Sequence, residues 1–172
     1  MDNFLPRSPL LNEVIEGRLA VEGSLSASQN LQRVIALMQD DDPSNRDWAT
    51  FIVSHTAIDT AEIRDALHKA VDDSDLEVRD EAILGLARRE PLAAISLLKP
   101  LLKEGLGHAL LEAAAIVAHP TPAPALEALR SWTGGREGTQ DRLETALEAC
   151  RSGVPADQER KVGQPHYLLS RS

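Results

Sequence analysis

The chain has 172 residues, of which 42% are hydrophobic and only 3% aromatic, and its formal net charge is −9. This length suits one domain with a sizeable core, and a core so poor in aromatic residues suits packed helices better than a β-sandwich. The acidic balance argues against a protein that grips nucleic acid electrostatically, because such proteins present a basic face to the phosphates.

The sequence also indicates a compartment. Its first six residues lack the basic and apolar regions of a signal peptide, and no apolar run is long enough to cross a bilayer. Cys150 is the single cysteine, so no disulfide can form within the chain. We therefore expect a cytoplasmic protein that does not associate with membranes.

In chain order, the predicted elements form three parts. Residues 1–27 predict an N-terminal capping segment, residues 28–151 a helical repeat domain, and residues 152–172 a flexible polar tail. Apolar spacing and helix breakers divide the middle part into eight helices. Their predicted bounds are 30–39, 44–55, 60–71, 75–89, 91–103, 108–119, 122–132 and 139–151.

These helices follow an internal repeat. Residues 42–49 align with residues 75–82 at an offset of 33, so that aspartate, arginine, aspartate and alanine coincide. A further 33 residues lead to Ala115, and a degraded fourth copy lies near residues 141–150. One helical hairpin cannot bury its own apolar face and needs stacked neighbours. The prediction is an all-α fold, an α-α superhelix of about four helical hairpins.

Capping residues support these helix starts. Asp42 is followed by Pro43, which is the pattern of an N-cap with proline at the first helical position. Ser74 and Glu77 have the spacing of a capping box, and Thr60 precedes the third predicted helix.

The run DDSDLEVRDEAILGLA, residues 72–87, resembles a HEAT repeat of the type shared with phycobilin-lyase accessory proteins. The likeness covers about residues 28–151 and is best in the second hairpin. In the first hairpin, Asn45 replaces the usual apolar residue. The resemblance implies a structural ladder between repeats, formed by an aspartate before each second helix and an arginine early in it. Carried onto this sequence, the ladder residues are Asp42, Arg46, Asp75 and Arg79.

Enzymes that resemble this fold give specific tests. Deoxyhypusine hydroxylases bind iron through His-Glu dipeptides, but none of the five histidines here is followed by glutamate. The related alkylpurine DNA glycosylases use a basic face, which the charge disfavours. His108 and Glu112 have the i, i+4 spacing of two metal ligands, but no third ligand is evident nearby. We expect no catalytic residue, no metal and no cofactor.

Binding residues follow from the repeat. In a HEAT solenoid the second helices line the concave face, and the core positions Val78, Ala82 and Leu86 identify the positions that point away from the core. Among these positions Trp48, Phe51 and Leu84 form an apolar strip bordered by charged residues, which resembles a protein-binding hot spot. The alternative is that the N-terminal segment folds over this strip. The predicted partner-binding residues are Asp47, Trp48, Phe51, His55, Asp80, Glu81, Leu84 and Arg88.

The sequence thus predicts a non-catalytic protein–protein interaction module, an adaptor or scaffold whose protein partner is basic or of mixed charge. One alternative is an immunity or antitoxin-type protein that masks a basic toxin. Another, implied by the resemblance, is a bilin-lyase-like protein that binds a chromophore.

Overall fold

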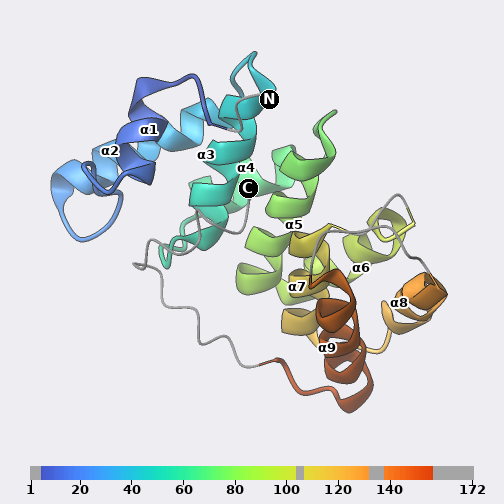
Figure 1. Cartoon of the computed structure of the whole chain (residues 1–172). Helices are drawn as coiled ribbons and strands as arrows, with labels where there is room; N and C mark the ends of the chain where they lie inside the picture. Colours follow the sequence, from blue (N-terminus) through green and yellow to red (C-terminus); the bar gives the residue numbers. More distant parts are fainter. Residues whose placement is uncertain (1–4, 104–106, 132–137, 157–172) are drawn as a thin grey trace. The chain divides into compact units, whose positions relative to one another are not determined.

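The structure is a computed structural model that describes residues 5–103, 107–131 and 138–156. All regular secondary structure in these residues is helical, which confirms the predicted all-α class (Figure 1). The described residues form two compact units, one up to Val78 and the other from Arg79 onward.

Four helices make up most of the first unit. In this unit α2 packs on α3, and α3 also contacts α1 and α4. The predicted bounds agree closely, except that α2 begins five residues early because the Ser24 hydroxyl accepts a hydrogen bond from the backbone N–H of Ala27. These helices are α1 (Pro9–Ile15), α2 (Leu25–Leu37), α3 (Pro43–His55) and α4 (Ala61–Ala70).

The N-terminal segment is held on α3. The backbone N–H of Ser8 donates to Asn45 Oδ1 over 2.8 Å, and Arg7 Nε lies 3.1 Å from Asp42 Oδ2. Leu11 of α1 is fully buried. These contacts are the kind that a capping segment would make, and the division at residue 27 remains a prediction.

The second unit begins within α5 (Leu76–Arg89), whose first turn belongs to the first unit. Here α7 packs against α6 and α9, and α8 packs against α9 (Figure 1). The predicted helix 122–132 is shorter in the structure, and its last residue, Trp132, lies outside the described residues. The remaining elements are α6 (Pro91–Leu101), α7 (His108–Val117), α8 (Ala123–Ala128), the 3₁₀ turn η1 (Leu129–Ser131) and α9 (Thr139–Ser152).

Both units have an aliphatic core. Ile63 and Leu67 of α4 are fully buried, as are Leu98 of α6 and Leu111 of α7. The described chain continues past α9 to Ala156, whose N–H donates to the Ala115 carbonyl over 3.1 Å. The predicted flexible tail falls mostly beyond this point, outside the described residues.

Candidate functional site

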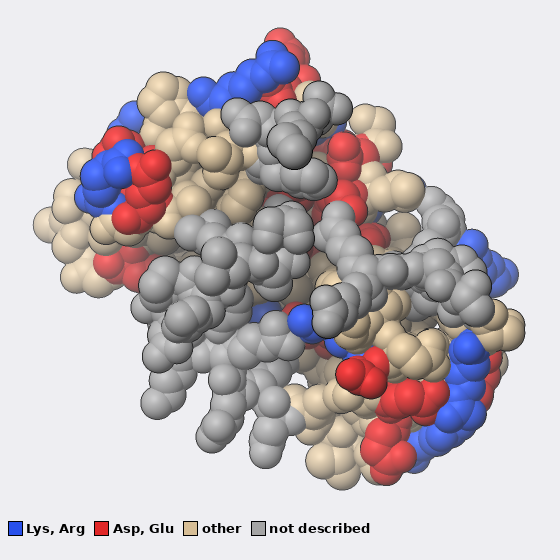
Figure 2. Space-filling view, in the orientation of Figure 1, with Lys and Arg blue, Asp and Glu red and all other residues tan. Residues whose placement is uncertain are grey.

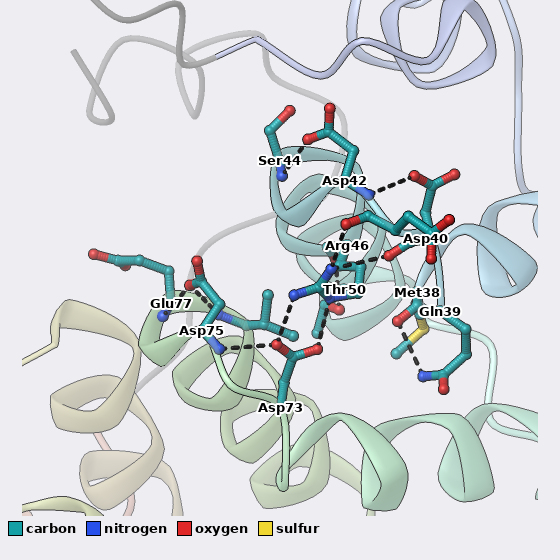
Figure 3. Close-up of polar contacts among 12 residues, drawn as sticks. Met38, Gln39, Asp40, Asp42, Ser44, Arg46, Thr50, Asp73, Asp75 and Glu77 are labelled. Atoms are coloured by element: carbon teal, nitrogen blue, oxygen red, sulfur yellow. Dashed lines mark hydrogen bonds and ion pairs between the residues drawn. The ribbon is translucent and has the colours of Figure 1, made fainter.

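The turns before α3 and α5 are 33 residues apart in the sequence and make equivalent hydrogen bonds (Figure 3). Asp40 Oδ1 accepts from the N–H of Asp42, and Asp73 Oδ1 accepts from the N–H of Asp75, each over 2.9 Å. The second aspartate of each turn caps its helix. Asp42 Oδ1 accepts from the backbone of Ser44 and Asp75 Oδ1 from that of Glu77, again over 2.9 Å. The aspartate repeat is therefore a repeat of turn geometry.

Arg46 bridges these two turns. Its Nε and Nη2 donate to the two carboxylate oxygens of Asp73 over 2.8 and 3.0 Å. Its Nη1 donates to the carbonyl of Asp40 over 2.9 Å and to that of Asp41 over 3.2 Å. The structure thus gives Arg46 the bridging role that the resemblance implies, but with Asp73 in place of Asp75.

The ladder expectation therefore needs correction at its aspartates. Asp42 and Asp75 are engaged as helix caps, and the residue that reaches the arginine lies two positions earlier in the turn. Likewise Asp75 Oδ1 accepts from the N–H of Glu77 at the start of α5. Arg79 is the equivalent of Arg46, but the position equivalent to Asp73 in the next repeat is 106, outside the described residues.

Electrostatics keep this network ionised. Partial burial alone would raise the pKa of Asp73, but hydrogen bonds from Arg46 and from the Asp75 N–H outweigh it and hold that pKa below its usual range. The pKa of Asp40 is lowered chiefly by the Asp42 N–H, with a further contribution from Asn45. The Asp73 carboxylate raises the pKa of Arg46. Groups so firmly charged at neutral pH suit a structural ion pair better than acid–base chemistry.

Asn45 stands where the second hairpin has the apolar Val78, and the structure explains why. Its side chain is buried and makes two hydrogen bonds, accepting from Ser8 N–H over 2.8 Å and donating to Asp40 Oδ1 over 3.2 Å. The polar residue therefore ties the N-terminal segment to the turn before α3. From the sequence Asn45 is visible only as a departure from the repeat, because its partner at position 8 is far away along the chain.

Three aromatic rings of α3 form a continuous cluster. The Trp48 ring meets the Phe51 ring edge-on, with centroids 5.7 Å apart and planes at 75°. The Phe51 and His55 rings are 4.3 Å apart and tilted by 37°. His55 Nδ1 lies 2.9 Å from the Phe51 carbonyl oxygen and 2.9 Å from Ser54 Oγ, and these contacts hold the imidazole beside the Phe51 ring.

The predicted exposed strip is only partly present. Trp48 is 4% exposed and Leu84 is 1% exposed, so neither offers a solvent-facing anchor. Trp48 follows Asn45 by three residues and precedes Ile52 by four, which places it beside the buried stripe of α3. Every residue from Asp80 to Ala87 is buried, so Asp80, Glu81 and Leu84 lie inside. The predicted residues that remain partly exposed are Asp47, Phe51, His55 and Arg88.

In the second unit the polar residues of α7 are engaged in structural contacts. Arg88 Nη2 donates to Glu112 Oε1 over 2.9 Å, and His108 Nε2 lies 2.9 Å from Thr139 Oγ1. His108 and Glu112 therefore have different neighbours despite their i, i+4 spacing. Among the described residues, no group of three His, Cys, Asp or Glu side chains is placed to hold a metal ion.

Cys150 is a buried residue of α9. Its Sγ donates to the Ala114 carbonyl over 3.5 Å. Burial raises the pKa of this thiol, and a weaker opposing effect comes from a hydrogen bond with the His119 backbone. A thiol that stays protonated at neutral pH is a poor nucleophile, and the surroundings of Cys150 are those of a small core residue.

The surface that can be described carries charges of both signs. Figure 2 shows basic side chains beside acidic ones on the face in view. Among the described residues, Arg64 pairs with Asp59 and Arg130 pairs with Glu144, each over 2.6 Å. Within the described ranges, no helix has both the length and the apolar character needed to cross a membrane.

Comparison with known proteins identifies the class. Residues 31–119, more than half of the chain, match the HEAT repeats family. The chain therefore belongs to the HEAT repeat family, which confirms the resemblance at family level and the predicted α-α superhelix. Folds of this family are typically non-catalytic and commonly mediate protein interactions.

Two bacterial proteins are similar to this chain in sequence. The chain is 32% identical over 97 residues to Protein YibA of Escherichia coli (strain K12) and, equally, to Protein YibA of Escherichia coli O157:H7. The match covers 56% of this chain and 35% of each relative, so the chain spans about a third of the length of these curated relatives.

A solved structure gives the same fold. The X-ray structure of Escherichia coli YibA aligns with a TM-score of 0.53 and 23% identity, covering 83% of this chain and 57% of that one.

Proposed function

We propose that this chain is a non-catalytic protein-interaction module, an adaptor or scaffold that binds a protein partner through the outward side of α3. We call this surface the α3 face and define it by Asp47, Phe51 and His55. The observation that carries the proposal is the stacked, partly exposed pair of Phe51 and His55, with ring centroids 4.3 Å apart.

The pair is well prepared for binding. Trp48 supports the Phe51 ring from the buried side, and the Phe51 carbonyl fixes the His55 imidazole. Little side-chain entropy is then lost when a partner covers these rings, and preorganised aromatic groups are typical binding anchors. Helical repeat arrays use extended surfaces of this kind for recognition.

Charge indicates the chemistry of the partner. The chain carries −9 overall, and the α3 face itself includes the partly exposed Asp47. Acidic residues near a binding face attract a basic partner and disfavour an acidic one. We therefore propose a protein partner with a basic or mixed surface and an apolar or aromatic anchor.

The experiment is an affinity capture with three forms of the full chain: wild type, a Phe51→Ala/His55→Ala variant, and Leu25→Ala. Leu25 is a matched control because it is an apolar residue of the same unit, 89% exposed on the first helix of the same hairpin. Circular dichroism verifies that all three are folded, and each captured protein is identified by mass spectrometry, purified and tested again for direct binding.

We expect one partner to be retained by the wild type and by Leu25→Ala, and lost by the double variant. Equal retention by all three forms would disprove a role for the α3 face. Trp48 is unsuitable for this test because the removal of a buried tryptophan destabilises the fold, by about 3–5 kcal/mol in typical cores.

A further inference from the structure

The last thirteen residues of the chain differ in charge from the rest. Residues 160–172 contain Arg160, Lys161 and Arg171 but none of the 27 acidic residues, so the remaining chain is more acidic than the overall −9. A cationic segment is thus joined covalently to an anionic body. Opposite charges on a surface and a ligand attract each other over a range of about 8–10 Å, which is the Debye length at physiological ionic strength, and this attraction favours their encounter.

The same segment also carries apolar anchors. Tyr167, Leu168 and Leu169 are consecutive and lie two residues before Arg171. An aromatic ring can extend the Phe51–His55 stack, since aromatic pairs prefer centroid separations of about 4.5–7 Å. The segment therefore combines basic charge with an apolar anchor, the two features proposed above for a ligand of the α3 face.

Length and tethering make such an occupant effective. Tyr167 lies 11 residues beyond Ala156, a stretch that spans roughly 36 Å when extended, whereas the longest helices, of 14 residues, measure about 21 Å. A tether that spans the distance between its anchor and a binding site gives an effective concentration of about 1 mM. A segment with a free dissociation constant of only about 0.1 mM would then occupy its site about 90% of the time.

We propose that residues 160–172 bind the α3 face within the same molecule and are the occupant that a protein partner must displace. The proposal takes its surface from the function proposed above and assigns that surface an intramolecular competitor. An occupancy of about 90% lowers the apparent affinity for an external partner about tenfold, because only the open fraction is competent to bind.

The test uses the full chain without any partner, so its outcome is independent of the capture experiment. A nitroxide is attached at Ser170→Cys, which leaves Tyr167 and the basic residues in place, and paramagnetic broadening is read from the backbone amide signals. Cys150 is buried, which protects it from labelling. Reduction of the nitroxide provides the reference spectrum.

Two variants complete the design. The first reverses the charges of the segment, with Arg160→Glu, Lys161→Glu and Arg171→Glu. The matched control reverses three exposed basic residues in described helices, with Arg33→Glu, Lys69→Glu and Lys99→Glu. Both carry the nitroxide at position 170 and change the net charge by the same amount.

We expect broadening centred on the amides around Phe51 and His55, its loss in the segment variant, and its retention in the control. Absence of broadening at α3, or broadening that persists after reversal of the segment charges, would overturn the proposal. A mixture of nitrogen-15 chains without nitroxide and unenriched chains with nitroxide gives a further test. Broadening in that mixture would show that the segment binds a second copy, and would likewise overturn binding within one molecule.

Discussion

Replacement of Arg46 by methionine tests the bridge between the two aspartate turns. Methionine keeps an unbranched apolar side chain but removes four hydrogen bonds, two to Asp73 and two to the carbonyls of Asp40 and Asp41. Asp73 keeps the bond from the Asp75 N–H but loses its cation. The variant leaves a largely buried carboxylate without its main partner.

The magnitude follows from burial. The side chains of Arg46 and Asp73 are 14% and 10% exposed. Removal of one partner from a fully buried pair costs about 3–5 kcal/mol, and residual solvent access places this pair at the lower end, about 3 kcal/mol. Single domains are stable by only about 5–15 kcal/mol, so the loss is large.

Urea denaturation followed by circular dichroism measures this loss, with Arg64→Met as the control. Arg64 also makes a bidentate pair, with Asp59, but these side chains are 40% and 39% exposed, and such pairs contribute about 0–1 kcal/mol. If Arg46→Met lowers the free energy of unfolding by no more than Arg64→Met does, the bridge contributes little and the reasoning is refuted.

Acid should reduce the difference between wild type and Arg46→Met. The folded pKa of Asp73 is lower than its usual value of about 3.9, so its contribution is complete above that value and is lost as pH falls through the folded pKa. The same denaturation at pH 7 and near pH 2.5 should give a smaller difference at the lower pH. A difference that is independent of pH would contradict the assigned ion pair.

Three further predictions concern single buried contacts. Asn45→Val restores the usual apolar residue of the repeat but leaves the N–H of Ser8 without its acceptor. We expect the free energy of unfolding to fall by about 1–3 kcal/mol and hydrogen exchange in α1 to become faster. Unchanged exchange would contradict the anchoring role of Asn45. Gly107→Ala places a Cβ where the Asp80 carboxylate lies, so we expect the free energy of unfolding, measured by thermal or urea denaturation, to fall by about 1–3 kcal/mol. A variant as stable as the wild type would contradict the close approach of Asp80 to Gly107. Cys150 should resist alkylation by iodoacetamide at pH 8 until the chain is unfolded, and rapid native labelling would contradict its burial.

The helices were predictable because their signals are local. Proline and aspartate mark the start of α3, Thr60 Oγ1 accepts from the N–H of Ile63 at the start of α4, and apolar spacing marks the buried faces between. The helix α1 was not predicted as a helix. It has only seven residues, too few to be stable without the contacts that its flanking residue Ser8 and its own Leu11 make.

The candidate site was less predictable, because it depends on contacts between distant residues. The repeat offset correctly relates the turns before α3 and α5, but it does not reveal which aspartate of each turn reaches Arg46. The same offset equates Phe51 with Leu84, although Phe51 is partly exposed and Leu84 is buried. A periodic pattern gives the direction of a side chain on its own helix but not what covers it.

The central claim, that the α3 face binds a protein partner, is tested most directly by calorimetric titration of the captured partner into wild type, Phe51→Ala and Leu25→Ala. We predict that Phe51→Ala weakens binding by about 2 kcal/mol, roughly thirtyfold, as expected for an aromatic anchor, while Leu25→Ala stays within about twofold of wild type. Equal affinities for wild type and Phe51→Ala would contradict the claim and remove Phe51 from the binding surface.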